Sequence, residues 1–412
     1  MQTFKCDECA HLLFFENNSC IRCGHLLGFS IEEGDMLTLR QVSQVPAANV
    51  PAAHKSIGQP AVMQNPMTSS AVNLSVIDQN TSHQKPAVRE HRPAGEAPAK
   101  TAAVHYVDVS DPTGPQYRLC SNATQLNACN WVIPAEQPHD FCVSCRLTEV
   151  LPPMPDESRR KQWVRVESAK RRLLYTLIGL GLPVQSREQN ANLGLAFRFE
   201  ESTAENPVYT GHASGVITLN MAEANHAFRE NAREKLGEVY RTVLGHLRHE
   251  CGHYYWELLV LPSAKWLPKA RAVFGDEQVS YQEAITRHYE EGAPANWSDH
   301  YISAYATMHP WEDWAETWAH YLHMLDTLET AAAYDLAVKS PSTKGKTRRT
   351  KSSMSHRENF DKLFEMWYSL TFVLNGLSRS MGMPDTYPFV ISHTVKEKLR
   401  LVHDIILDLG RG

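Results

Sequence analysis

The chain has 412 residues, of which 42% are hydrophobic and 21% charged, as in ordinary globular proteins of two or three domains. Its formal net charge of −5 gives no overall attraction to nucleic acid or to an anionic membrane. The first residues, MQTFKCDECA, lack the basic and apolar regions of a secretion signal, and no uncharged apolar run is long enough to span a membrane. We therefore expect a cytoplasmic protein with no membrane partner.

The first thirty residues contain two C-x2-C pairs, Cys6 with Cys9 and Cys20 with Cys23. In a cytosolic chain such pairs indicate zinc rather than disulfides. Two thiolates on one tight turn can face the same tetrahedral ion, and a second pair completes the coordination shell. Residues 1–30 are therefore predicted to form a zinc ribbon that needs its metal in order to fold.

The next segment, residues 31–104, is rich in Ala, Pro, Val, Gln and Ser without a sustained period, which predicts a flexible linker. This linker should let the first ribbon fold independently. Residues 105–153 hold a second group of four cysteines, which we expect to bind a second structural zinc ion. They are Cys120, Cys129, Cys142 and Cys145. Trp131 should pack against the hairpin of this module. The alternative, eight buried free cysteines, fits two such groups poorly.

From about residue 158 the pattern indicates helices with two strands. ESAKRRLLYTLIGLG has apolar residues at helical spacing and ends on a glycine, whereas GLAFRFEES and SGVITLNMAEA are typical of strands. Further helices are predicted at 236–261, 279–291, 311–335, 357–379 and 393–409. The basic, Ser/Thr-rich residues 338–355 predict a solvated loop, with a nucleic-acid-binding segment as the alternative.

The stretch LGHLRHECGHYYWELL, which starts at Leu244, contains the pattern H-E-x-x-H from His249 to His253. One helical turn separates the two imidazoles, so both can bind one zinc ion, and Glu250 can take a proton from a water there. The bare pattern also arises by chance. Here, however, the flanking segments are apolar around most of the helix, and burying these three residues without partners would be costly. His246, one turn earlier, is more simply a packing or hydrogen-bonding residue.

A third ligand should come from a later helix, because Trp256 and Leu259 occupy the positions where the metzincin pattern needs glycine and histidine. The segment YATMHPWEDWAETWAHYLHMLDT supplies Glu312 and Glu316, which lie one turn apart among tryptophans. Either carboxylate can serve as the ligand. Cys251 is most simply a small packing residue.

These stretches together resemble a family of bacterial zinc-binding metallopeptidases with an N-terminal zinc ribbon. The resemblance rests on TGHASGVITLNMAEAN, YRTVLGHLRHECGHYYWELL and SAYATMHPWEDWAETWAHYLHMLDTLETA, and on both cysteine segments. It implies an α+β fold with a mostly helical, zincin-like domain and a small sheet in residues 158–412, preceded by two zinc-ribbon modules. It also implies one catalytic and two structural zinc ions and a protein or peptide substrate. By analogy with such folds, GVITLN is expected to be an edge strand that binds the substrate backbone.

A more distant similarity, to the catalytic domain of anthrax lethal factor, suggests roles within the site. That domain has a tyrosine and then E-x-x-A-E after its H-E-x-x-H helix, which correspond here to Tyr305, Glu312 and Glu316. The similarity implies that Glu312 is the third ligand, that Glu316 supports a ligand and that Tyr305 stabilises the oxyanion. The resulting hypothesis is peptide-bond hydrolysis with Glu250 as general base. The alternative is a non-catalytic adaptor whose ribbons bind protein or nucleic acid.

Overall fold

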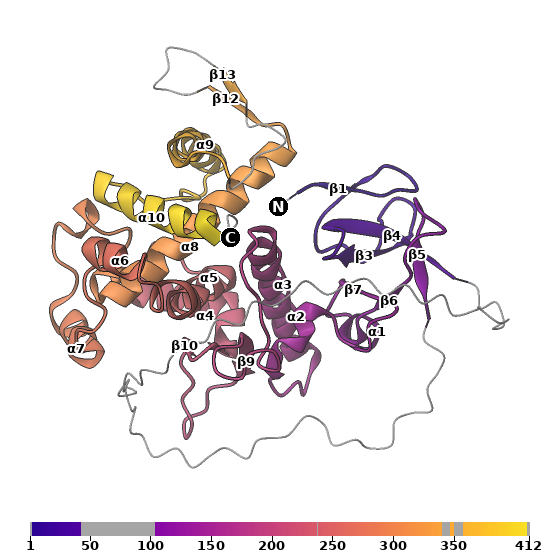
Figure 1. The fold of residues 1–412 in the computed structure, drawn as a ribbon, viewed down its shortest axis with the longest axis horizontal. Helices are drawn as coiled ribbons and strands as arrows, with labels where there is room; N and C mark the ends of the chain where they lie inside the picture. Colours follow the sequence, from indigo (N-terminus) through magenta and orange to yellow (C-terminus); the bar gives the residue numbers. More distant parts are fainter. Residues whose placement is uncertain (1, 43–103, 237, 340–346, 350–356, 410–412) are drawn as a thin grey trace. The chain divides into compact units, whose positions relative to one another are not determined.

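The computed structural model describes residues 2–42, 104–236, 238–339, 347–349 and 357–409. Its N-terminal part consists mainly of short strands (Figure 1) and contains two four-cysteine groups. Strands β1 (Phe4–Lys5) and β2 (Leu12–Leu13) form a hairpin. A five-stranded sheet follows in the order β3-β4-β5-β6-β7. Its strands are β3 (Leu26–Ser30), β4 (Asp35–Gln41), β5 (Tyr106–Asp108), β6 (Tyr117–Leu119) and β7 (Val132–Pro134).

The predicted linker is wrong at its N-terminal end, because β4 lies inside residues 31–104 and pairs with β3. Its sequence DMLTLRQ has three apolar residues, all of them buried in β4, a signal that the Ala/Pro-rich composition of the segment obscures. Residues 43–103, the remainder of the prediction, lie outside the described residues. Next to this segment, the backbone N–H of Val42 donates to the carbonyl of His105 at 2.9 Å.

Two short helices, α1 (Ser121–Leu126) and α2 (Val143–Arg146), directly follow Cys120 and Cys142. A second sheet has the order β10-β11-β9-β8. Its strands are β8 (Thr148–Val150), β9 (Ala196–Glu200), β10 (Gly211–Ala213) and β11 (Val216–Asn220). β8, β9 and β11 are parallel, and β10 is antiparallel to β11. The expectation that GVITLN is an edge strand is therefore wrong: β11 is an inner strand, and β10 lies at the edge.

The helices carry most of the remaining chain and confirm the mixed helix-and-sheet fold. They are α3 (Glu157–Gly179), α4 (His226–Leu236), α5 (Val243–Tyr255), α6 (Leu267–Phe274), α7 (Tyr281–Glu291), α8 (Pro310–Ala333), α9 (Phe360–Ser380) and α10 (His393–Leu409). Helices α4 and α6 were not predicted, because α4 is rich in charged residues and α6 is short. Strands β12 (Ala337–Lys339) and β13 (Thr347–Arg349) form a hairpin within the predicted basic loop, of which residues 340–346 and 350–355 are outside the described residues. None of the described helices combines the length and apolarity needed to cross a bilayer.

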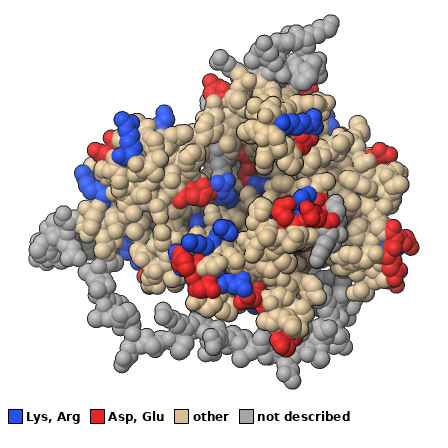
Figure 2. Space-filling view, turned by 180° about the vertical axis from the view of Figure 1, so that it is seen from behind, with Lys and Arg blue, Asp and Glu red and all other residues tan. Residues whose placement is uncertain are grey.

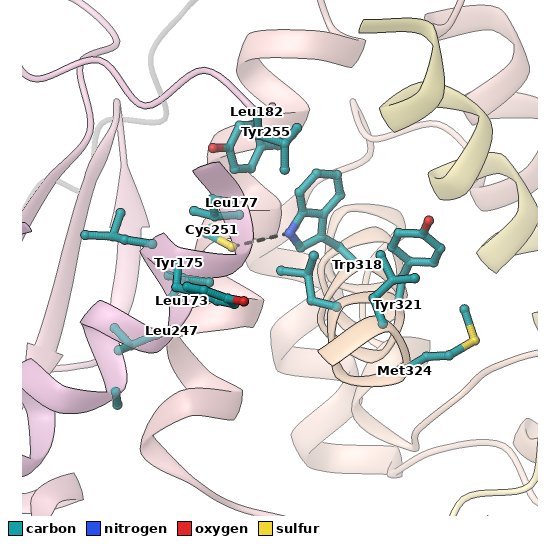
Figure 3. Close-up of a cluster of buried hydrophobic side chains, with 14 of the residues drawn as sticks. Leu173, Tyr175, Leu177, Leu182, Leu247, Cys251, Tyr255, Trp318, Tyr321 and Met324 are labelled. Carbon is teal, nitrogen blue, oxygen red and sulfur yellow. Dashed lines mark hydrogen bonds between the residues drawn. The ribbon is translucent and has the colours of Figure 1, made fainter. Parts of the chain in front are cut away.

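The core of the helical part lies where α3, α5 and α8 meet (Figure 3). Leu173 from α3 and Leu247 from α5 are both fully buried there. Between α5 and α8, the indole N–H of Trp318 donates to the sulfur of Cys251 at 3.3 Å. Cys251 is fully buried and close to apolar side chains, which confirms the prediction that it is a packing residue.

The first ribbon shares this core rather than folding apart from it. The ring of Phe29 in β3 lies 5.0 Å from that of Phe15, 5.4 Å from Trp131 and 5.8 Å from Tyr175 of α3. The ring of Trp131, expected against the hairpin of its own module, thus packs against the first ribbon. At the second cysteine group, the guanidinium of Arg171 in α3 donates to the carbonyl of Ala128 at 2.8 Å. Both cysteine groups are therefore joined to α3 by buried contacts.

The shared core predicts how the whole unit responds to one truncation in the ribbon. Phe29→Ala should lower the free energy of unfolding by about 3–5 kcal/mol, because Phe29 is 0% exposed and a cavity would replace its ring. The loss should shift one cooperative transition that includes the helices. Chemical denaturation followed by far-UV circular dichroism measures it. Phe14→Ala is the matched control, since Phe14 is 59% exposed in the same ribbon. A separate early transition with an unchanged helical transition would contradict the shared core.

Candidate metal centre and active site

Helix α5 places His249, Glu250 and His253 in the interior. The hydroxyl of Thr242 caps this helix by accepting a hydrogen bond from the backbone N–H of Gly245 at 2.9 Å. The three residues of the H-E-x-x-H pattern, His249, Glu250 and His253, are all buried. At its end α5 continues directly into a π-helical turn, Trp256–Val260, a rare geometry that often occurs at functional sites.

Helix α8 brings the two glutamates to α5. Its first residue is Pro310, and Nδ1 of His309 accepts a hydrogen bond from the backbone N–H of Trp311 at 3.1 Å. Glu312 lies in the first turn, where the helix dipole favours a negative charge. Glu316 follows one turn later on the same face.

A glycine permits the two helices to approach closely at the site. A Cβ atom on Gly252 would lie 2.9 Å from the Cα of Ala315 and 3.2 Å from the Cβ of Trp318. Real Cβ atoms almost never come within 3.0 Å of a heavy atom elsewhere in the fold, so any larger residue at 252 would push α8 away from α5. The carbonyl of Gly252 also accepts the indole N–H of Trp314 at 2.8 Å. Gly252 occupies one of the two variable positions of the H-E-x-x-H pattern.

Three ligand-type atoms converge between these helices. Nε2 of His249 lies 2.9 Å from Oε2 of Glu312 and 3.2 Å from Nε2 of His253, and the remaining pair, His253 to Glu312, is 3.5 Å apart. Zinc–nitrogen distances of 2.0–2.1 Å in a tetrahedron separate two ligand atoms by roughly 3.4 Å. Two imidazole nitrogens and one carboxylate oxygen, all from buried residues, therefore fit a zinc ion with one coordination position left for water or substrate.

Further polar side chains hold these ligands in place. Nδ1–H of His249 donates to Oε1 of Glu316 at 2.7 Å, and the hydroxyl of Ser303 donates to Oε2 of the same glutamate at 2.6 Å. The hydroxyl of Tyr281 donates to Oε1 of Glu312 at 2.9 Å. Tyr281 and Ser303 were missed from the sequence. Ser303 begins the segment SAYATMHPWEDWAETWAHYLHMLDTLETA but was given no role there, and Tyr281 lies in no recognisable motif. The packing of α7 and of the loop before α8 brings both to the site.

The other predicted site residues can now be placed. Tyr305 lies in a short 3₁₀ turn, and its ring centroid is 5.9 Å from that of His249. Nδ1 of His246 is 3.7 Å from Oε2 of Glu223, and His246 is not among the three converging ligands. Glu316 contacts the far nitrogen of His249, so Glu312 alone of the two glutamates joins both histidine Nε2 atoms.

Electrostatics distinguish the carboxylates of the site. Burial raises the pKa of Glu312, but the charges and hydrogen bonds of the two histidines outweigh it and hold the pKa well below the ordinary value. Glu316 behaves alike, with a pKa of about 2 because the contact with His249 outweighs burial. Burial raises the pKa of Glu250, and the two histidines only partly oppose this. Glu250 is therefore the carboxylate with the greatest affinity for a proton.

The eight cysteines other than Cys251 form two further candidate metal sites. In the first, the sulfurs of Cys6 and Cys23 are 3.5 Å apart and those of Cys9 and Cys20 are 3.6 Å apart. In the second, Cys129 and Cys142 are separated by 3.7 Å. Zinc–sulfur distances of 2.3 Å in a tetrahedron place neighbouring sulfurs roughly 3.8 Å apart, so both groups have the spacing of a four-thiolate zinc site. The described cysteines form no disulfide.

Comparison with known proteins agrees with both kinds of site. Residues 159–405 match the family described as "Putative zinc-binding metallo-peptidase", and residues 3–92 and 85–156 match a zinc-ribbon domain family. The chain belongs to this zinc-binding metallo-peptidase family. The family match contains the three ligand-type residues of α5 and α8, and the zinc-ribbon matches contain both four-cysteine groups.

Relatives of this family member extend over its full length. Proteins from Mycobacterium tuberculosis and Mycobacterium bovis, whose names describe them as uncharacterized, are 35% identical over 406 residues. The alignment covers 98% of this chain and 95% of each relative. The ribbon and helical parts thus occur together in these relatives. No solved structure matches the chain significantly.

One face of this metallo-peptidase family member bears on the suggested nucleic-acid partner. Figure 2 shows Lys and Arg side chains intermixed with Asp and Glu side chains on that face, without an extended area of positive charge. Several arginines of the described chain are paired with carboxylates, as Arg198 is with Glu149 and Arg241 with Glu223. Nucleic acid binds to clustered, unpaired positive charge, and the face in Figure 2 has no extended area of it among the residues drawn in colour.

Proposed function

We propose that the chain is a zinc-dependent peptidase that hydrolyses peptide bonds of a protein or peptide substrate. The observation that carries this proposal is the convergence of His249, His253 and Glu312 within 3.5 Å of one another, with a buried acid next to the first histidine. Zinc with three protein ligands and an open position lowers the pKa of water to about 7 and polarises a carbonyl. Because the eight thiols of the two four-cysteine groups stay reduced only under reducing conditions, we place the reaction in the cytoplasm.

The residues of the chain divide the work as follows. Glu250 accepts the proton of the attacking water and later delivers it to the leaving amine, which suits a carboxylate whose pKa is raised by burial. Tyr305 donates a hydrogen bond to the carbonyl oxygen as negative charge develops there. Glu316 holds Nδ1–H of His249, and Tyr281 holds the second oxygen of Glu312, so both ligands keep their orientation.

The proposal is tested by metal content together with cleavage. The full chain should contain three zinc ions, one at each candidate group, when measured by elemental analysis. The zinc-loaded protein should cleave peptides in a library derived from a whole proteome, and a chelator should abolish cleavage. If a chain with all its zinc cleaves none of these peptides, the site is not hydrolytic and the adaptor hypothesis is favoured.

Two tyrosines provide a matched pair of variants. Tyr305→Phe should leave zinc affinity unchanged and lower kcat by ~10²–10³, because its hydroxyl acts on the developing oxyanion. Tyr281→Phe should instead weaken zinc binding by roughly 10–100-fold, because it removes the donor to Glu312. Chelator competition measures zinc affinity in both variants, and steady-state kinetics at saturating zinc measures kcat. Exchanged effects in the two variants would reverse these assignments.

A further inference from the structure

The two histidines of the candidate zinc site differ in how their second ring nitrogen is held. Nδ1 of His249 donates to Glu316 at 2.7 Å. Nδ1 of His253 is buried, yet it has no hydrogen-bond partner among the residues that the structure describes. Histidines that bind a metal through Nε2 almost always donate Nδ1–H to a carboxylate, a carbonyl or water. The second ligand of the site therefore calls for a partner.

Glu257 is placed to be that partner. It follows His253 by four residues, in the π-helical turn Trp256–Val260. Side chains of helical residues lean toward the N-terminus, so the side chain of Glu257 extends toward the turn that carries His253. Its Oε2 atom is buried and, within the described parts of the chain, also lacks a hydrogen-bond partner. Burial raises the pKa of Glu257, and the charge of His253 is the interaction that opposes the rise.

A neighbouring histidine does not fill this role. Nε2 of His212, in edge strand β10, lies 4.0 Å from Oε2 of Glu257. The same nitrogen accepts the backbone N–H of Gly215 at 3.0 Å, so it carries no proton to donate to the glutamate. Instead, the ring of His212 stacks on that of His253 with 6.3 Å between the centroids. The ring centroid of Trp311 lies 4.2 Å from that of His253. These two rings restrict the plane of His253, whose Nδ1, like that of His212, has no hydrogen-bond partner among the described residues.

We propose that Glu257 is a positioning residue of the zinc site, whose carboxylate accepts Nδ1–H of His253 through one water. The proposal rests on the proposed zinc site and deepens it. Each histidine ligand then has its own carboxylate: Glu316 from α8 for His249, and Glu257 from the π-helical turn for His253. The second carboxylate comes from the same continuous helix as the ligand it orients, so it depends on the local geometry of that turn.

Zinc affinity of the full chain gives the first test. Glu257→Ala should weaken zinc binding at this site by roughly 10–100-fold in chelator competition. Glu257→Gln keeps the shape and an oxygen acceptor, so its loss should be smaller than that of the alanine variant. Glu188→Gln, which neutralises an exposed carboxylate in the loop after α3, is the control and should bind zinc as the wild type does.

The second readout reports on the hydrogen bond itself. In the cobalt-loaded protein, the exchangeable imidazole N–H protons of metal-coordinating histidines come from His249 and His253, because the ligands of the other two groups are cysteines. His25 lies beside the first group, with Nδ1 3.4 Å from the sulfur of Cys23, but it is not one of the ligands, so its proton would show a smaller shift. Wild type should show two such protons protected from exchange with water. In Glu257→Ala the proton of His253 should exchange faster while that of His249 is unchanged.

The outcomes separate this proposal from the proposed function. Unchanged affinity and exchange in Glu257→Ala would overturn it. Weaker zinc binding with unchanged exchange of the His253 proton would also overturn it, since Glu257 would then act only on the helix. A wild type that binds zinc at His249 and His253 but cleaves no peptide would refute the peptidase while leaving the role of Glu257 measurable.

Discussion

Glu250→Gln should retain zinc and lose hydrolysis by at least ~10²–10⁴, the usual effect of removing a general base. An amide cannot accept the proton of the attacking water, yet it has the size of the carboxylate and leaves His249, His253 and Glu312 in place. Burial raises the pKa of Glu250, so the native side chain has a stronger affinity for a proton than an exposed glutamate. The measurement is kcat/KM on a peptide found in the library screen, with zinc content determined on the same sample.

Two controls make this result specific. Glu188→Gln makes the same chemical change at an exposed site and should keep full activity. His249→Ala should lose both zinc and activity, which separates removal of a ligand from removal of the base. If Glu250→Gln hydrolyses the peptide as fast as wild type while Glu188→Gln is also normal, Glu250 is not the base and the mechanism is wrong.

Glu312→Ala should empty the catalytic site of zinc, whereas Glu316→Ala should only weaken it. Oε2 of Glu312 lies 2.9 Å and 3.5 Å from the two Nε2 atoms that face it, so it belongs to the set that would surround the ion. Glu316 contacts Nδ1 of His249 instead, on the side away from those atoms. Loss of such an indirect contact costs roughly 10–100-fold in affinity, and loss of a direct ligand costs more.

Zinc titration of the full chain distinguishes the two variants. After dialysis against limiting zinc, Glu312→Ala should hold two ions, those of the cysteine groups, and should stay at two in moderate excess. Glu316→Ala should return to three when zinc is added. The cysteine groups act as an internal reference, because neither substitution touches them. The reverse ranking would make Glu316 the ligand and would require α8 to shift when the metal binds.

Much of the candidate site follows from short-range patterns. The helical repeat places His249 and His253 on one face whatever the rest of the fold does, and it places Glu312 and Glu316 together in the same way. Apolar residues around both segments predict that the helices are buried, as they are. The cysteine spacing similarly indicates two compact groups, because two residues between thiols leave little freedom.

Long-range packing explains the contacts of the site and core that were not predicted. Tyr281 is 31 residues from the glutamate that it contacts, and no periodicity links them. Phe29 and Tyr175 belong to segments that each look complete, so nothing in either sequence shows that their rings meet. Strand β10 is only three residues long, and without it β11 resembles an edge strand. These three errors concern contacts between segments, whereas β4, α4 and α6 were missed in their local conformation.

The close approach at Gly252 changes how distant sequences of this kind should be screened for a working metal site. The two helices that carry the ligands come into close contact at Gly252 because this residue has no side chain. The absence of a Cβ there therefore sets the spacing between the histidines and Glu312. A sequence that keeps every ligand but has a bulky residue at this position would pass a motif search and still fail to coordinate. A useful search pattern therefore includes the glycine as a spacer alongside the residues that touch the ion.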